Sequence, residues 1–313
     1  MSILKGRGGE LPLLAIVLVI IVIIAVVGMV VFFPWKEINV DVTRTVEMAP
    51  GTTEVDLNLD QEVGIIEVAF SDTSEDIVMI VEGTLRQNLL ASGDPLEIMW
   101  SFDLVSERLI LNAGVDIASF ATTYGNDEIV TKLSIPSRLS AMVNVSGTVG
   151  SIELSAADGV SLRGAHLSET TGSVLVRLTD ATLSGEFNMQ STTGGCTLEW
   201  SDVNIVDFAQ VSASCTTGGI IMDVSQANTL GGDLSLAASA TTGGIELDLS
   251  IEGENSARVV SSTELGNIDV GTLTGFTGSN EDLKSNNYPS EFRMDIAVNT
   301  QLGGVSLNLE YLS

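Results

Sequence analysis

The sequence predicts an all-β protein in which a single N-terminal transmembrane helix precedes a β-rich subdomain and a β-solenoid. Three observations support this fold class. A glycine turn recurs about every 23 residues, strands with two-residue alternation flank each turn, and one long uncharged stretch lies near the N-terminus. The expected segments are a cytoplasmic tail 1–10, a helix 11–33, a subdomain 37–137 and the solenoid 138–313.

The uncharged stretch 11–33 is long enough to cross a membrane as a helix. At about 1.5 Å per residue it spans roughly 30 Å, the thickness of the hydrocarbon core. Lys5 and Arg7 precede it and favour a cytoplasmic N-terminus, which places the remainder of the chain outside the membrane. We therefore expect a single-pass cell-membrane protein with an uncleaved signal anchor.

Two alternatives to an anchor are open for this segment. A cleaved signal peptide fits less well, because the apolar run is long and no small-residue cleavage site follows it. A pilin-like leader is the other alternative. The segment resembles pilin precursors in its short basic, glycine-containing start and in the acidic Glu10 before the apolar run. Sequencing of the mature N-terminus would distinguish these possibilities.

Residues 37–137 are rich in short alternating runs but lack paired glycines. Gly51, Gly83 and the segment 93–95 punctuate these runs, a pattern typical of strands joined by turns. We predict an antiparallel subdomain here. It would cover the membrane-proximal end of the solenoid, since an open strand edge invites association with other chains.

The solenoid is predicted from a repeated turn whose best copies, Thr-Thr-Gly-Gly, begin at Thr192, Thr216 and Thr241. An alternating apolar strand follows each copy and another precedes it. One such unit cannot bury its apolar side alone, so the repeat indicates stacked coils with threonine pairs aligned along the stack. The first glycine of each turn would supply the positive φ of a tight corner; these glycines are Gly150, Gly172, Gly194, Gly218, Gly243, Gly266 and Gly303. An antiparallel meander closed into a sandwich is the alternative fold.

Three consecutive segments, 132–136, 141–145 and 147–154, resemble a known family. A strand ending in proline leads into a valine-containing strand, a glycine turn and an apolar strand. This pattern is similar to the putative-adhesin or toastrack type of β-repeat domain of bacterial and archaeal envelope proteins. The resemblance covers roughly residues 128–313. It implies a right-handed β-repeat architecture, often membrane-tethered, and it implies no catalytic residues.

The composition is strongly acidic, with 41 acidic against 13 basic residues and a formal net charge of −28. This charge argues against nucleic acid as a partner, because nucleic-acid-binding surfaces carry basic patches. The expected partners are instead an extracellular protein or a polysaccharide. His166 is the only histidine, and alignment of the repeats places it on the outside of a coil at the position of Ala237. We predict no catalytic residues, no cofactor and no enzymatic activity.

The most specific candidate for a metal site is a row of charged residues. Each lies the same number of residues after the first glycine of its turn. Arg177, Glu199, Asp223 and Asp248 occupy the same outward position in four coils. Three stacked carboxylates repel one another, and a Ca²⁺ ion, which prefers oxygen ligands, would relieve that repulsion. A solvated acidic surface is the simpler interpretation. A Ca²⁺-dependent carbohydrate-active β-helix enzyme is a further alternative, with Arg177 as its only candidate base.

Two covalent features complete the list of candidate sites. Cys196 and Cys215 belong to adjacent coils and both point inward, so a disulfide and a pair of buried thiols are both possible. Asn144 opens a glycosylation sequon. We expect a structural, adhesive or ligand-presenting role at the cell surface, with a pilin-like filament subunit as the alternative.

Overall fold

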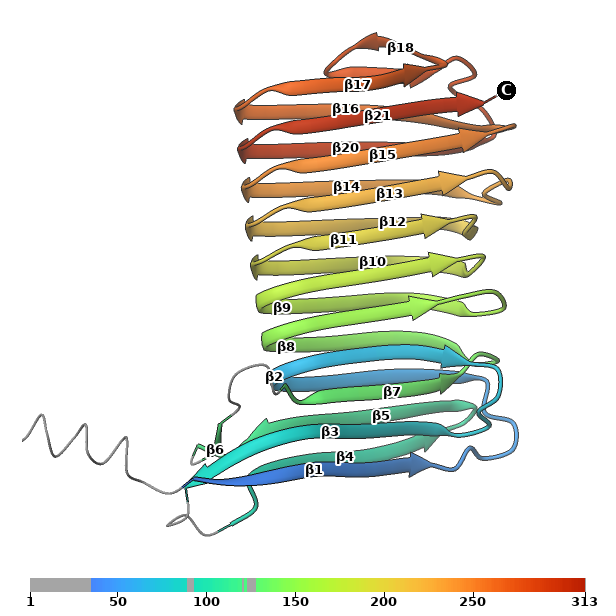
Figure 1. The fold of residues 1–313 in the computed structure, drawn as a ribbon. Helices are drawn as coiled ribbons and strands as arrows, with labels where there is room; N and C mark the ends of the chain where they lie inside the picture. The colour runs from blue at the N-terminus through green and yellow to red at the C-terminus, as the bar shows by residue number, and fades with distance from the viewer. Residues whose placement is uncertain (1–34, 89–92, 120, 123–127, 313) are drawn as a thin grey trace, which may run out of the picture.

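The computed structural model describes residues 35–88, 93–119, 121–122 and 128–312, and these residues form 21 strands and no helix (Figure 1). In chain order the strands are β1 (Trp35–Val46), β2 (Glu54–Ser71), β3 (Ile77–Asn88), β4 (Leu96–Val105), β5 (Arg108–Ile117), β6 (Ala121–Thr122), β7 (Val130–Pro136), β8 (Ser140–Ala156), β9 (Ser161–Thr179), β10 (Thr182–Thr193), β11 (Cys196–Ser201), β12 (Asn204–Thr217), β13 (Ile220–Gln226), β14 (Asp233–Thr242), β15 (Ile245–Glu252), β16 (Asn255–Leu265), β17 (Ile268–Thr274), β18 (Phe276–Ser279), β19 (Asp282–Ser285), β20 (Phe292–Leu302) and β21 (Val305–Leu312).

The predicted fold class needs one correction, because it included a transmembrane helix. None of the described residues forms a helix long and apolar enough to cross a membrane. In strands such as β13 and β15, successive side chains are alternately buried and exposed. This two-residue period is that of a β-strand, so these segments pair edge to edge and do not form helices. Residues 1–34, which include the expected tail and the helix 11–33, lie outside the described residues. The predicted β-rich repeat is confirmed.

The strands stack as coils whose neighbours pair in parallel and in register. For example, β9 pairs in parallel with β8 on one side and with β10 and β11 on the other. Each coil contributes to two sheets that meet at the glycine corners (Figure 1). Sheet A contains β5, β10, β12, β14, β16 and β20; sheet B contains β7, β11, β13, β15, β17 and β21; β2, β8 and β9 run through the corner and belong to both. This parallel pairing differs from the antiparallel meander considered as an alternative.

Each end of the stack contains a coil inserted out of sequence order. Near the N-terminal end, β2 lies between β8 on one side and β5 and β7 on the other. Near the C-terminal end, β20 and β21 lie between the coil β14–β15 and the coil β16–β17. The chain therefore crosses over one inserted coil at each end of the stack. At these crossings the Ser137 amide donates to Ser71 O and the Gly253 amide donates to Leu312 O, each at 3.1 Å.

Antiparallel strands cover most of the outermost coil edges. At the N-terminal end β4 pairs with β5, and β3 followed by β1 extends sheet B beyond β7. At the C-terminal end β19 and β18 lie along β16, whereas β17 pairs only with β21 among the described residues. Residues 54–71, within the expected subdomain 37–137, lie inside the stack.

The core consists of aliphatic side chains stacked between the two sheets. Leu198, Met222, Leu247 and Leu307 follow one another in register along sheet B, and all four are fully buried. Such burial removes apolar surface from water in every coil and is the main force that holds the stack together.

The corners explain why glycine recurs. Gly218 has φ of +141°, and a Cβ at this position would lie only 1.4 Å from the carbonyl oxygen of Gly194 in the neighbouring coil. Both the backbone conformation and the close approach therefore exclude a side chain at Gly218, which confirms the predicted positive φ there. Of the seven predicted corner glycines, Gly266 does not have a φ in this region. At the following glycine, Gly219, the nearest atom to a Cβ would be 3.6 Å away. The threonines before the corners align along the stack as predicted; they are Thr193, Thr217 and Thr242.

Candidate functional site

The predicted row of charges on sheet B is in register. Glu199 lies between Arg177 and Asp223 on adjacent strands, and Asp248 follows Asp223. The Arg177 guanidinium donates to Glu199 Oε2 at 2.8 Å and also contacts Glu153, and its hydrogen bond to Glu199 raises its pKa. At the other end of the row, Asn308 Nδ2 donates to Asp248 Oδ1 at 2.6 Å. Neighbouring side chains of the protein therefore already bind two of the three carboxylates.

A metal ion needs ligands that converge on one point, whereas register pairing places side chains along a line. Carboxylates on adjacent strands are separated by the strand spacing, about 4.8 Å, and side chains two strands apart are separated by twice that. Among the described residues, no group of three or more histidine, cysteine, aspartate or glutamate side chains is arranged to hold a metal ion. The Ca²⁺ site at Glu199, Asp223 and Asp248 stays a prediction.

The two cysteines meet inside a corner. The Cys215 thiol lies 3.3 Å from Cys196 Sγ, both side chains are buried, and both thiols are free. The hydrogen bond with Cys215, together with burial, raises the pKa of Cys196. The disulfide between Cys196 and Cys215 stays a prediction, and the two thiols lie where oxidation would join two adjacent coils.

A second row of polar residues, on the outer side of sheet A, did not figure among the predicted sites. Six residues on adjacent strands align there, and we call them the amide row: Asn112, Asn58, Asn144, His166, Asn188 and Ser212. His166 was expected on the outside of its coil at the position of Ala237, and the register agrees, because Ala237 follows Ser212.

Hydrogen bonds join the amide row in two separate groups. Asn144 Nδ2 donates to Asn58 Oδ1 and Asn58 Nδ2 donates to Asn112 Oδ1, each at 2.9 Å. In the other group, Asn188 Nδ2 lies 3.0 Å from His166 Nδ1, and the Ser212 hydroxyl donates to Asn188 Oδ1. Within the described residues no hydrogen bond joins Asn144 to His166. This break leaves the Asn144 Oδ1 acceptor and one ring nitrogen of His166 without a partner among the described residues.

A shallow hollow of about 500 Å³ lies over this break. Four residues of the amide row line it: Asn58, Asn112, Asn144 and His166. Three more polar residues lie two positions further along their strands: Asp60, Ser146 and Ser168. The Ser146 hydroxyl donates to Asp60 Oδ1 at 2.7 Å, so these hydroxyl and carboxylate groups are fixed in place. The surface offers both donors and acceptors, and only Asp60 carries a formal negative charge.

Asn144, the residue of the predicted glycosylation sequon, lies within this hollow. Its side chain is half-buried and its amide nitrogen is committed to Asn58. Glycosylation at Asn144 stays a prediction. A glycan attached here would cover the hollow.

Two arginines bracket the acidic residues beside the hollow. Arg163 contacts Asp56, and Arg108 Nε lies 2.8 Å from Glu54 Oε2. The hydrogen bond to Glu54 raises the pKa of the Arg108 guanidinium. These pairs neutralise the charges of Glu54 and Asp56 next to the amide row.

These features define an all-β protein of stacked coils with a shallow hollow, lined in part by amide, hydroxyl and imidazole groups, on one sheet. No family model and no curated protein matches the chain. Several solved structures resemble it. Three of them are a putative cell adhesion protein from Clostridium sporogenes (9% identity, TM-score 0.43, covering 87% of this chain and 100% of that one), a putative adhesin from Bacteroides fragilis (12%, 0.32, 87% and 96%) and a putative adhesin from Parabacteroides distasonis (12%, 0.33, 89% and 97%).

Proposed function

We propose that this chain is an extracytoplasmic β-solenoid that acts in adhesion by binding a ligand on the outer side of sheet A. The observation that carries this proposal is the hollow over the interrupted amide row. It collects amide, hydroxyl and imidazole groups from four adjacent strands into one hydrogen-bonding surface. The role is binding and presentation, without catalysis.

The ligand class that fits this surface is a neutral polysaccharide. Sugar hydroxyls both donate and accept hydrogen bonds, as do the asparagine amides and serine hydroxyls of the hollow. The side chains recur at the strand spacing of about 4.8 Å, so a ligand with a regular repeat of hydroxyl groups would meet equivalent partners along the stack. An anionic polymer would instead be repelled by a chain whose net charge is −28.

The test is to measure binding of the full chain to a soluble neutral glucan by titration calorimetry. Replacing Asn58 and Asn144 together by alanine should weaken binding roughly tenfold or more, because each lost hydrogen bond contributes about 1 kcal/mol. Asn308→Ala is the matched control, since Asn308 is a hydrogen-bonded asparagine on the outer side of sheet B.

Three results would contradict the proposal. Neutral polysaccharides could fail to bind, the double variant could bind as well as the parent, or Asn308→Ala could weaken binding equally. If a protein ligand bound with the same dependence on Asn58 and Asn144, the surface would be supported and the polysaccharide class rejected.

A further inference from the structure

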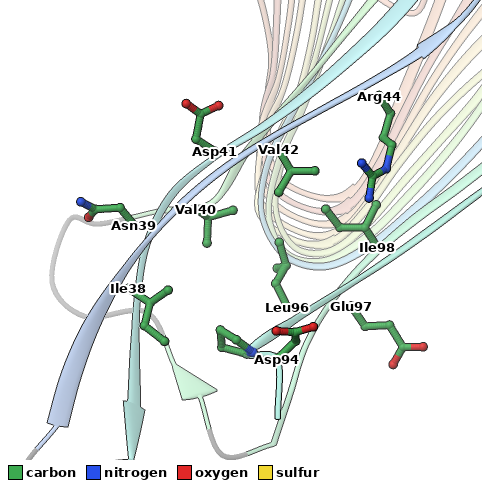
Figure 2. A pocket seen from close by; sticks show the side chains of 11 residues that line it. Ile38, Asn39, Val40, Asp41, Val42, Arg44, Asp94, Leu96, Glu97 and Ile98 are labelled. Carbon is green, nitrogen blue, oxygen red and sulfur yellow. The ribbon is translucent and has the colours of Figure 1, made fainter.

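A groove at the N-terminal end of the stack is separate from the amide row. It lies between β1 and β4 and has a volume of about 700 Å³. Figure 2 shows Val40 and Val42 on β1 pointing toward Leu96 and Ile98 on β4, with Ile38 beside them. The floor of the groove is therefore apolar and continues the core of the stack to its open end.

The two strands that form the groove also present unpaired edges. Among the described residues, β1 pairs only with β3 and β4 only with β5. Along β4 the apolar row continues past Ile98 to Phe102 and Leu104, which are 53% and 47% exposed. Free backbone groups beside exposed apolar side chains are the features by which one strand recruits another.

Arg44 and Asp94 carry opposite charges at the two ends of this groove, and the side chains of Asp41 and Glu97, which also line it, point away from its apolar floor (Figure 2). Figure 2 shows Arg44 beside Ile98, whereas Asp94 lies at the other end, next to Leu96. Both side chains are exposed. Within the described part of the chain neither forms an ion pair, and the only hydrogen bond of the Arg44 side chain is a 3.5 Å contact with Thr43 O.

We propose that this groove binds a second copy of the chain, end to end, about a two-fold axis. A two-fold contact brings the same surface of both copies together in opposite directions, so Arg44 of each copy would face Asp94 of the other. The apolar floors and Phe102 would be buried against each other, and two ion pairs would fix the orientation.

The overall charge favours this end over the sides of the stack as the contact. The chain carries a net charge of −28, and side-by-side packing would bring the acidic outer surfaces of two copies together. An end-to-end contact instead directs the two stacks away from each other. It also covers both free edges, which removes the tendency of each strand to pair with unrelated chains.

The test uses charge reversal of the full chain and sedimentation over a range of concentrations. The parent should form a dimer of twice its 32.8 kDa mass. Arg44→Asp and Asp94→Arg should each raise the dissociation constant at least roughly tenfold, because like charges would then face each other in both contacts. An equimolar mixture of the two variants should restore the dimer, since every contact in the mixed pair joins an aspartate to an arginine.

Lys284→Asp on β19, at the opposite end of the stack, is the matched control and should leave the dimer unchanged. The proposal is overturned if the parent is monomeric throughout, if mixing the two variants restores nothing, or if Lys284→Asp dissociates the dimer equally. A series of growing oligomers would also overturn it, because a two-fold contact closes after two copies.

Discussion

The central coils, from β8 to β15, stack in the order in which they occur in the chain, whereas each end contains a coil added out of order. Within the central region successive coils pair in sequence order, whereas its first strand, β8, and its last coil, β14–β15, each pair on their outer side with an inserted coil. At the ends, the earliest coil, β2, and the latest, β20–β21, are each placed between two others. The two regions use the same corners and the same kind of core.

This difference bears on how the stack resists opening. In an array where each repeat contacts only its neighbours, the terminal repeat has one partner and separates most easily. Here β20 and β21, the last two strands in sequence order, have partners on both sides. Removing them would disrupt two interfaces at once. Pairing β20–β21 with β14–β15 joins segments that are far apart in sequence, and closing such a long loop slows the formation of these contacts during folding.

The largest effect should come from a corner glycine in the central region. Gly218→Ala would place a methyl group 1.4 Å from Gly194 O and would force alanine into a positive φ. We expect a loss of about 4 kcal/mol in the free energy of unfolding, measured by urea denaturation. Gly219→Ala is the matched control, since its methyl group would meet nothing closer than 3.6 Å. Equal losses in the two variants would refute this account of the corner.

Oxidation of the cysteine pair should have the next largest effect, with opposite sign. A disulfide between Cys196 and Cys215 would close a loop of about 20 residues and stabilise the fold by about 3 kcal/mol. Because both thiols are buried, oxidation should be carried out during refolding. The melting temperature of the oxidised chain should rise and return after reduction, while Cys215→Ser should show neither change. A lower melting temperature would mean that the corner cannot accommodate the bond.

The corners could be predicted from the sequence because the need for glycine at a corner depends on the local backbone conformation. A position such as Gly218 needs glycine whatever its neighbours are, so the glycine recurs wherever a coil turns. The order of the coils is not local. Ile268 and Val305 both follow a corner with the same alternation, and either could pair with Ile245; the structure pairs Val305 with Ile245 and places Ile268 beyond it. The alternation fixes which side is buried but not which coil is adjacent.

The same limit explains why the amide row was missed. His166 could be placed on an outer surface, because its coil belongs to the regular repeat. Asn58 and Asn112 lie in coils at the N-terminal end, where Gly64 forms a corner with φ of +123° but lacks the second glycine and the threonines. A lone glycine between two strands is equally typical of a hairpin, so the alignment of Asn58 with Asn144 required the structure.

The crossing near the C-terminal end offers a smaller effect, confined to that region. The Asn255 side chain is fully buried, accepts from the Leu230 amide at 3.1 Å and donates to the carbonyls of Asn228 and Glu252 at 2.9 and 3.0 Å. Asn255→Ala would leave the buried Leu230 amide without its acceptor and remove the two donated hydrogen bonds, which should cost about 2 kcal/mol. Hydrogen exchange should accelerate in β16 and β20 and stay unchanged in β11. If hydrogen exchange accelerated equally in β16, β20 and β11, the C-terminal end would not unfold separately from the central coils.

The smallest effect concerns an acid buried in a central corner. Glu169 is 2% exposed, its Oε1 has no hydrogen-bond partner among the described residues, and its carboxylate occupies the space that a side chain at position 147 would fill. Burial raises the pKa of Glu169, against the weaker opposing effect of hydrogen bonds from the Thr171 and Thr170 amides. The folded state therefore holds this proton more tightly than the unfolded chain does.

The consequence is a pH dependence that distinguishes this corner from its neighbours. A folded-state pKa above the unfolded value contributes stability that is complete below about pH 4.5 and is lost as pH rises through the raised folded-state value. Glu169→Gln should remove this part of the pH dependence, measured by urea unfolding at several pH values. Glu186→Gln, an exposed acid in the next coil, should leave it intact. If both variants kept the parent's pH profile, Glu169 would be ionised in the folded protein, and its buried charge would need a partner at the corner.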